Sequence, residues 1–438
     1  MESIKQKTPR ASLWRRTKNF LAVLGPGFVT GAADDDPSGI VTYSQTGAQF
    51  GLGQLWLTVF MLPLMVAIQE MAARIGVVTG KGITAIIKEN YSRQVLYVIV
   101  LILFVANTIN LGADLGAMAE SARLIYNLPV AVYLIIFFGI ILLLEIQLAY
   151  HQYAKVLKWL TLVLFSYFLT GFIVSGNWGQ ILRATFLPHL EFNFQFLLIV
   201  VGVLGTTISP YMFFWQAAQE VEEERDQKYL DQFRLPNVPE KYLANMRLDT
   251  FVGMFFSELA TWFIIITTAA VLHNNGVTDI STAAQAAAAI EPLVHVFPHA
   301  GKISEILFSA GIIGTGFLAI PIFAASSSYA VSEIFEWNEG LSKTFSQARN
   351  FYLVIILGCL VGLLINFIGI NPIKALVYTA ILNGFAAVPI IFLLIKITGN
   401  KAIMGPNTSG FWSRLFSWLT FGGMASAALL AVYNFLFR

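Results

Sequence analysis

Long apolar stretches, separated by short polar loops, dominate the chain. A helix needs about 20 mostly apolar residues to cross a bilayer, and by that measure the sequence predicts eleven membrane spans. They lie at 20–48, 54–78, 95–121, 130–150, 157–176, 196–218, 248–273, 303–332, 350–369, 375–397 and 412–436. We therefore expect an all-α polytopic membrane protein.

The distribution of basic residues gives the orientation. If the N-terminus is cytoplasmic, most of the 27 Lys and Arg residues fall in the tail and in the loops on the cytoplasmic side. Such loops carry an excess of Lys and Arg. We expect a multi-pass protein of the cell membrane with a retained cytoplasmic tail at 1–19 and an external C-terminus.

The amino-acid composition argues against several classes of function. Hydrophobic residues make up 57% of the 438 residues, and the net charge of +2 predicts no nucleic-acid partner. The one cysteine, Cys359, excludes a disulfide framework and a thiolate metal cluster. We expect the lipid bilayer as surroundings, no cofactor, no obligate protein partner and no enzyme activity.

The first span is interrupted by acids and a proline. Asp34, Asp35 and Asp36 precede Pro37, which cannot donate a backbone hydrogen bond, and Gly39 follows. Irregular backbone at membrane depth survives only where protein buries it or water lines it. Intramembrane acids are costly and mark functional sites. The pattern predicts a broken helix with carboxylates at the break.

A similar interruption occurs five spans later, at Gly205-Thr-Thr-Ile-Ser-Pro-Tyr211. An odd offset inverts the second half relative to the first, and paired broken helices indicate a transporter's midplane site. The predicted domains are a first five-helix repeat at 20–195, an inverted repeat at 196–397 and a last helix at 398–438.

Together the two breaks predict a cation site. Asp36 is the best ligand because the residue before a proline is pushed out of helical geometry. The Thr206 carbonyl and the Ser209 hydroxyl are the matching oxygen donors. These are hard ligands, suited to Mg²⁺, Mn²⁺ or Ca²⁺. Ser209 has an alternative role in satisfying local backbone.

Other intramembrane polar residues are candidates for the pathway or for coupling. Asn107, Asn110 and Asp114 share one helical face, where a polar track and interhelical hydrogen bonding are equally good interpretations. The full set of these candidates is Asp34, Asp35, Asn107, Asn110, Asp114, Tyr211, Glu258 and Asn383.

Three further expectations concern charged side chains. Glu70 and Arg74, at i and i+4, predict an ion pair. Asp249 is expected to begin the seventh span, where a carboxylate suits a helix N-terminus. The insert from Glu220 to Arg247 is expected to be a short amphipathic helix and turn or, preferably, a solvated charged loop.

Several motifs resemble the Nramp family of divalent-metal transporters over nearly the whole chain. They are Gly25-Pro-Gly-Phe-Val, Asp36-Pro37, Gly47-Ala-Gln-Phe-Gly51, Gly76-Val-Val-Thr-Gly-Lys-Gly82, Gly205-Thr-Thr-Ile-Ser-Pro-Tyr211, Phe385-Ala-Ala-Val-Pro389 and Ala402-Ile-Met-Gly405. The resemblance implies a five-plus-five inverted repeat like that of the leucine transporter, with alternating access.

The chain departs from the family's motifs at the site. Gly39 stands where the family's first-helix motif, Asp-Pro-Gly-Asn, has its Asn ligand, and Ser209-Pro210-Tyr211 replaces Met-Pro-His. The third-helix Asp-Leu-Ala-Glu becomes Asp114-Leu-Gly-Ala, and a tenth-helix Gln ligand aligns with Leu382, beside Asn383. Losing the thioether hardens the site. A missing side chain at Gly39 gives room for a larger, partly hydrated ion.

The resulting hypothesis is import of Mg²⁺ or Mn²⁺ to the cytoplasm, with proton coupling in doubt because the family's His and Glu are absent. The alternatives in transport are an amino-acid/cation symporter of the same fold and a proton-coupled Mn²⁺/Fe²⁺ transporter. An integral-membrane enzyme or receptor is less favoured, since no nucleophile motif or sizeable soluble domain is present. An ion channel is less favoured because the asymmetric, single-chain repeat favours alternating access.

Overall fold

The computed structural model describes residues 24–147, 165–191, 193–226 and 239–437, which form helices and no strands. The helices are α2 (Pro26–Asp34), α3 (Pro37–Phe50), α4 (Trp56–Thr79), α5 (Ile83–Asn90), α6 (Arg93–Ile125), α7 (Val130–Gln147), α9 (Phe165–Val174), α10 (Trp178–Phe186), α11 (Phe194–Thr207), α12 (Pro210–Asp226), α13 (Glu240–Val271), α14 (Ala283–Ala288), α15 (Glu291–Val294), α16 (Ala300–Phe335), α17 (Arg349–Ile365), α18 (Pro372–Gly399), α19 (Lys401–Met404) and α20 (Phe411–Phe437). Two 3₁₀ turns, His273–Asn275 and Asn366–Ile368, follow α13 and α17.

The spans agree with the sequence pattern. Within the described residues, nine helical stretches are long and apolar enough to cross a membrane, counting Phe194–Arg225 as one. The first predicted span is present as the two shorter helices α2 and α3. The fifth, 157–176, lies partly outside the described residues, which contain its end as α9. The all-α membrane fold is therefore confirmed.

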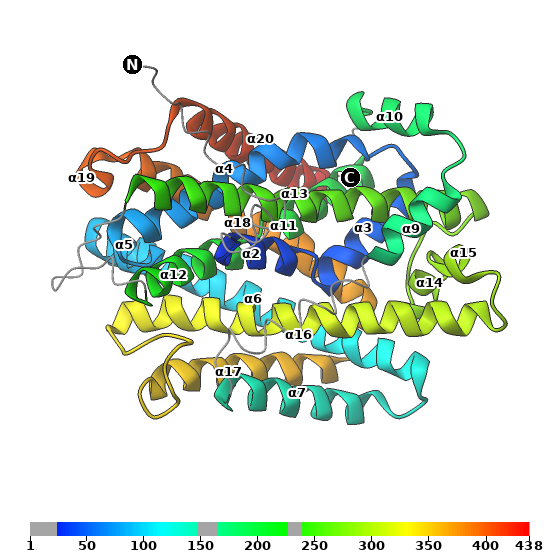
Figure 1. Ribbon diagram of the computed structural model, residues 1–438, viewed down its shortest axis with the longest axis horizontal. Coiled ribbons are helices and arrows are strands. Elements are labelled where there is room, and N and C mark those ends of the chain that lie inside the picture. The colour runs from blue at the N-terminus through cyan, green and yellow to red at the C-terminus, as the bar shows by residue number, and fades with distance from the viewer. Residues whose placement is uncertain (1–23, 148–164, 192, 227–238, 438) are drawn as a thin grey trace, which may run out of the picture.

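The broken helices lie at the centre of the bundle (Figure 1). Helix α13 packs along both α2 and α3, α18 along α11, and α16 along α6. Helices α7 and α17 lie outside α16, while α4 and α20 lie on the opposite side of the bundle (Figure 1). The breaks are thus enclosed by helices from both halves of the chain.

Small residues allow the central helices to touch. A Cβ added to Gly31 of α2 would lie 2.3 Å from the backbone of Gly253 in α13. One added to Gly205 of α11 would lie 2.1 Å from the carbonyl oxygen of Ala380 in α18. Helices in a bilayer associate by packing rather than by a hydrophobic force, so small residues mark their contacts.

Two expectations about charged segments are wrong. Helix α12 continues to Asp226, and Glu220, Glu222 and Glu224 are buried rather than solvated in a loop. Residues 227–238 of that insert lie outside the described residues. Asp249 does not begin its helix, because α13 already starts at Glu240. Both errors arise where helices extend beyond the apolar core and pack against neighbouring segments.

Candidate functional site

The first break falls at Asp35 and Asp36. Helix α2 ends at Asp34, and Asp36 is extended, with φ −68° and ψ 172°. The Asp36 carboxylate accepts a hydrogen bond from the Gly39 amide at 2.6 Å and so caps helix α3. Aspartate is favoured at this position because it satisfies an amide that has no helical partner. Asp36 is thus fixed at the break, 1% exposed.

Each break leaves a backbone carbonyl without its helical donor, because the residue four positions later is proline. In the first break this is Ala33, four residues before Pro37. The hydroxyl of Tyr211 donates to that carbonyl at 2.9 Å. In the second break it is Thr206, four residues before Pro210. The Thr206 carbonyl therefore stands at the C-terminal end of a half-helix, where the dipole favours a cation.

The second break directly adjoins the first. Helix α11 ends at Thr207 and α12 begins at Pro210. The Thr207 hydroxyl lies 2.9 Å from the Tyr43 hydroxyl of α3. The Ser209 hydroxyl donates to the Gly205 carbonyl at 2.6 Å, which is the local backbone role considered above. Its oxygen keeps lone pairs that can accept or ligate.

There is little space for a side chain at Gly39. A Cβ added there would lie 2.8 Å from the Asp34 carbonyl oxygen and 3.4 Å from Asp36 Oδ1. Glycine is therefore needed for a close approach of backbone at the break. The structure differs here from the expectation that Gly39 leaves open space beside the ion.

The other two acids of the first break, Asp34 and Asp35, lie near side chains of α13. Ser257 of α13 donates its hydroxyl to the Asp34 carboxylate. Glu258, the next residue, is 4% exposed and lies within electrostatic reach of Asp35. Both carboxylate oxygens of Glu258, and Oδ1 of Asp34 and of Asp35, lack hydrogen-bond partners among the described residues. Buried carboxylates of this kind require a cation, a proton or water.

The polar face of α6 serves two purposes. The Asn107 amide donates to the Phe323 carbonyl at 3.2 Å and to the Ser327 hydroxyl at 3.0 Å, so it joins α6 to α16. Asn110 and Asp114 instead lie within electrostatic reach of Asp36. Within the described part of the chain their buried side-chain polar atoms make no hydrogen bond of normal geometry, although Asn110 lies beside the Asp36 carboxylate. The face therefore combines interhelical bonding with polar groups beside the break.

Helix α18 contributes a further polar group near the site. The hydroxyl of Ser38 donates to the Leu376 carbonyl at 2.9 Å, which fixes the start of α3 against α18. Asn383, two turns further along α18, is 1% exposed, and its Nδ2 has no partner in the described ranges. A buried donor without a partner is uncommon and indicates a functional role or an ordered water.

The sequence did not reveal what Asp249 does. Its carboxylate accepts from the amides of Gly25 at 2.9 Å, Gly27 at 2.7 Å and Phe28 at 3.1 Å. These are amides at the start of α2, which have no helical acceptors. The only sequence signal is that Gly25-Pro26 starts a half-helix without a side-chain cap of its own.

The chemistry of the site is that of mixed oxygen donors. In the described residues no three His, Cys, Asp or Glu side chains group closely enough to hold a metal by themselves. The groups available at the breaks are one capping carboxylate, backbone carbonyls, a hydroxyl and amides. A small divalent ion that keeps several waters suits such a set.

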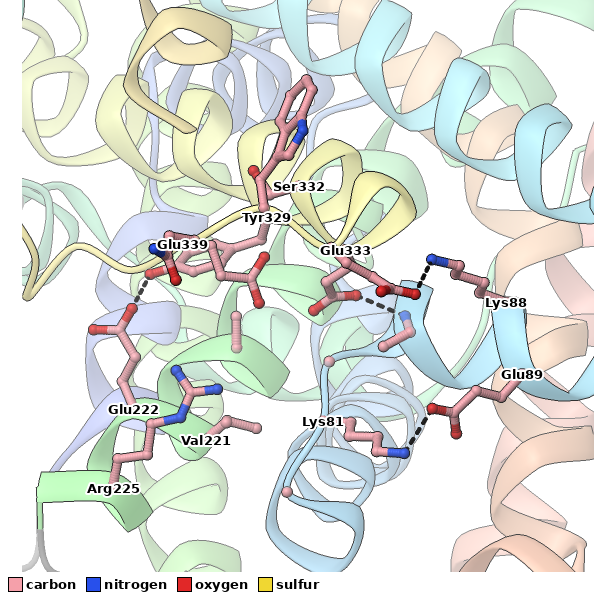
Figure 2. A pocket seen from close by; sticks show the side chains of 17 residues that line it. Lys81, Lys88, Glu89, Val221, Glu222, Arg225, Tyr329, Ser332, Glu333 and Glu339 are labelled. Atoms are coloured by element: carbon pink, nitrogen blue, oxygen red, sulfur yellow. Dashed lines mark hydrogen bonds and ion pairs between the residues drawn. The ribbon is translucent and has the colours of Figure 1, made fainter. Parts of the chain in front are cut away.

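A pocket of about 580 Å³ lies at the predicted cytoplasmic end, between α5, α12 and α16. Figure 2 shows Glu222 of α12 directed at Tyr329 of α16, while Arg225, Glu333 and Glu339 line the same pocket. Glu222 accepts from the Tyr329 hydroxyl and from the Leu341 amide, the latter at 2.9 Å. It therefore fastens α12 to α16 and to the segment after it.

Two other carboxylates of this pocket differ in their roles. Glu333 accepts from the Ala85 amide at 2.8 Å and so holds the start of α5. Burial, together with the neighbouring Glu333 carboxylate, raises the pKa of Glu339 to about 9, although Arg225 opposes the shift. Glu339 is therefore protonated at neutral pH.

Comparisons with known proteins agree with this architecture. The model of the natural resistance-associated macrophage protein-like family, Nramp, matches residues 27–434. The divalent metal cation transporter MntH of Bacillus subtilis is 24% identical over 417 residues, covering 92% of this chain and 90% of that protein. MntH of Clostridium acetobutylicum is 24% identical over 420 residues, covering 92% of this chain and 89% of its own length.

Solved structures show a similar fold. The manganese transporter of Eremococcus coleocola has a TM-score of 0.73 at 17% identity and covers 98% of this chain and 88% of its own. MhsT, solved in complex with L-phenylalanine, has a TM-score of 0.60 at 12% identity and covers 94% of this chain and 97% of its own. At these identities the likeness concerns the fold alone.

Proposed function

Because the chain belongs to the Nramp family, we propose that it is a secondary transporter that moves a divalent metal cation across the membrane by alternating access. The observation that carries the proposal is the direct contact of the two helix breaks through Tyr211 and Ala33. In this proposal the buried Asp36 carboxylate and the Thr206 carbonyl, whose helical donor would be the amide that Pro210 lacks, both face the ion at that junction. Relatives that this chain resembles are named divalent metal cation transporters.

The proposed cargo is Mg²⁺ or Mn²⁺, imported to the cytoplasm. Asp36 supplies charge, and the Thr206 carbonyl and Ser209 hydroxyl supply oxygen ligands, with no sulfur at the second break. Hard cations prefer oxygen, whereas soft metals prefer thioether or thiolate. Water would complete the coordination, because Gly39 carries no ligand side chain of its own.

The unpartnered polar groups outline a route to and from this site. Asn110 and Asp114 of α6 lie near Asp36, and Glu258 of α13 lies near Asp35. We infer that a passing cation, with its water, satisfies these groups in turn. The metal gradient alone drives uptake in this proposal, since the second break carries tyrosine where a titrating histidine would be needed for proton release.

An amino-acid/cation symporter is the second candidate, favoured only by the shared fold. Such a substrate would bring its own carboxylate to the freed amides of a half-helix. Here the amide of Gly39 is already occupied by Asp36, and further acids surround it. Charge repulsion therefore disfavours a carboxylate ligand and favours a cation.

Uptake into proteoliposomes tests the proposal. We expect Asp36→Ala to abolish Mg²⁺ and Mn²⁺ uptake, while Asp279→Asn, a change at an exposed aspartate, retains it. Wild-type uptake by Asp36→Ala would overturn the site.

An internal pH dye should report no metal-dependent acidification, and a clear acidification would show proton coupling. Competition by Cd²⁺ far stronger than that by Mg²⁺ would contradict a hard site.

A further inference from the structure

A hollow of about 490 Å³ lies on the outside of the bundle, between α4, α13 and α20. One end is apolar and includes Leu62, Pro63 and Phe416, and the other holds Glu70, Arg74 and Arg247. It is separate from the helix breaks and from the pocket in Figure 2. Its form suits a molecule with a long apolar part and a compact anionic end.

Arg74 is the buried group of this hollow. It is 4% exposed, and its guanidinium bonds Glu70 and, at 3.2 Å, the Asn407 carbonyl. Its Nε has no hydrogen-bond partner among the described residues. Leaving a charged donor buried and unpaired is costly. The positive charge of Arg74 therefore adds to the field inside the hollow.

The remaining charge of the hollow is positive. Glu70 is fully engaged, because it accepts from Arg74, from Arg247 at 3.3 Å and from Ser413 at 3.3 Å. Two arginines therefore face one carboxylate, and the Arg247 side chain is 53% exposed. Arginine presents several donors in a planar fork that matches a phosphate. The charged end is thus complementary to a phosphodiester anion.

The hollow as a whole, from its apolar end to its charged end, has the length of one lipid leaflet. From Leu62 to Arg74, helix α4 rises about 18 Å at 1.5 Å per residue. This is enough to cross one leaflet of a hydrocarbon core about 30 Å thick. Phe411 and Trp412, which border the charged end, are exposed. Exposed aromatic residues of this kind gather at the headgroup level.

We propose that this hollow is a binding site for an anionic phospholipid of the cytoplasmic leaflet. Arg74 and Arg247 would hold the headgroup phosphate, and one acyl chain would lie along α4 between Pro63 and Phe251. The chain's own first 23 residues are the competing occupant, but they are rich in Lys and Arg and would be repelled by the two arginines. Binding here does not depend on the transported cation.

Thermal unfolding and native mass spectrometry of the full chain test this site, with phosphatidylglycerol and phosphatidylcholine as probes. We expect phosphatidylglycerol to stabilise the protein and to stay bound, and Arg247→Gln to weaken its apparent affinity by about tenfold. Arg247 is exposed, so this variant should fold, whereas Arg74→Gln would remove the buried partner of Glu70. Arg349→Gln, at another exposed arginine, is the matched control and should bind as wild type.

Each contrary result has a definite meaning. Equal stabilisation by both lipids, or equal loss in Arg247→Gln and Arg349→Gln, would overturn the site. Stabilisation by soluble glycerol phosphate to the same degree would show an anion site without a lipid chain. A rise in apparent affinity of about tenfold on deletion of residues 2–18 would show that the tail occupies the hollow instead.

Discussion

The hydroxyl of Tyr211, in the first turn of α12, donates to the carbonyl of Ala33 in the last turn of α2, with 2.9 Å between the two oxygens. The bond joins the two interrupted helices across the middle of the bundle. It exists because Pro37 cannot supply the amide that Ala33 would otherwise bind. In the sequence, Tyr211 is a departure from the family motif. In the structure it has a specific hydrogen-bond partner, the Ala33 carbonyl.

Removing this hydroxyl should loosen the junction. Tyr211→Phe keeps the ring contact with Phe323, whose centroid is 4.1 Å away, but leaves the Ala33 carbonyl buried and unpaired. That loss costs about 1–3 kcal/mol. We expect a lower thermal midpoint and slower Mn²⁺ uptake in proteoliposomes. Tyr133→Phe, which removes a hydroxyl bonded to an exposed backbone carbonyl, should leave uptake unchanged; equal effects of the two variants would contradict a role at the junction.

A softer ligand at the second break should change the preference among metals. Ser209→Cys replaces the hydroxyl with a thiol of similar size, and thiols favour Cd²⁺ over Mg²⁺. We expect inhibition of Mn²⁺ uptake by Cd²⁺ to strengthen by about tenfold, while inhibition by Mg²⁺ weakens. Ser346→Cys, at an exposed residue of the segment between α16 and α17, serves as control. Unchanged competition in Ser209→Cys would remove Ser209 from the ligand set.

The close contact between α11 and α18 predicts a large packing effect. Gly205→Ala would place a Cβ 2.1 Å from the Ala380 carbonyl oxygen, so the helices must separate. Such overpacking typically costs about 1–3 kcal/mol. We expect a clear fall in the thermal midpoint and in uptake. Gly139→Ala, where a Cβ meets nothing within 4 Å, should be neutral or slightly stabilising, and a matching fall there would refute the packing explanation.

The protonated Glu339 predicts a dependence of stability on pH. Its pKa is about 9 when folded, above the usual value of 4.5. Between those values the folded protein holds a proton that the unfolded chain has released, so stability falls as pH rises. The thermal midpoint of the wild type should therefore drop by a few degrees from pH 6 to pH 9. Glu339→Gln should flatten this slope, whereas a parallel slope in the variant would exclude Glu339 as its source.

The three bonds to Asp249 predict where amide exchange should change. Asp249→Asn keeps the shape but removes the charge that binds the amides of Gly25, Gly27 and Phe28. We expect faster hydrogen exchange over 25–30, with little change in α16. Exchange as slow as in the wild type would show that the charge is dispensable for holding α2.

The sequence was sufficient where the cause of a feature is local. Pro37 and Pro210 remove helical hydrogen bonds from their own chain segments, so both breaks could be located from the residues alone. Glu70 and Arg74 are one helical turn apart, and their predicted ion pair is confirmed. The apolar run lengths likewise predicted the membrane fold.

What the sequence could not reveal depends on partners distant along the chain. Asp249 caps α2 only because α13 packs beside it, and Glu222 is buried only because Tyr329 and the Leu341 amide meet it. Asn107 and Asn110 share one helical face, yet only Asn107 has partners on α16. The ligand roles of Asp36, Gly39, Thr206 and Ser209 remain predictions.

The attachment of α2 to α13 also affects how the bundle can move. Three amides bound to Asp249, and the backbone contact of Gly31 with Gly253, tie the first half-helix to a neighbour from the second half of the chain. A swing of α2 alone would break all of these at once. We expect α2 and α13 to tilt together as one rigid lever, with Asp35 and Asp36 as its hinge. Because Ser257 of α13 also bonds Asp34, Glu258 would travel with α2 in such a tilt, and its position relative to Asp36 would change.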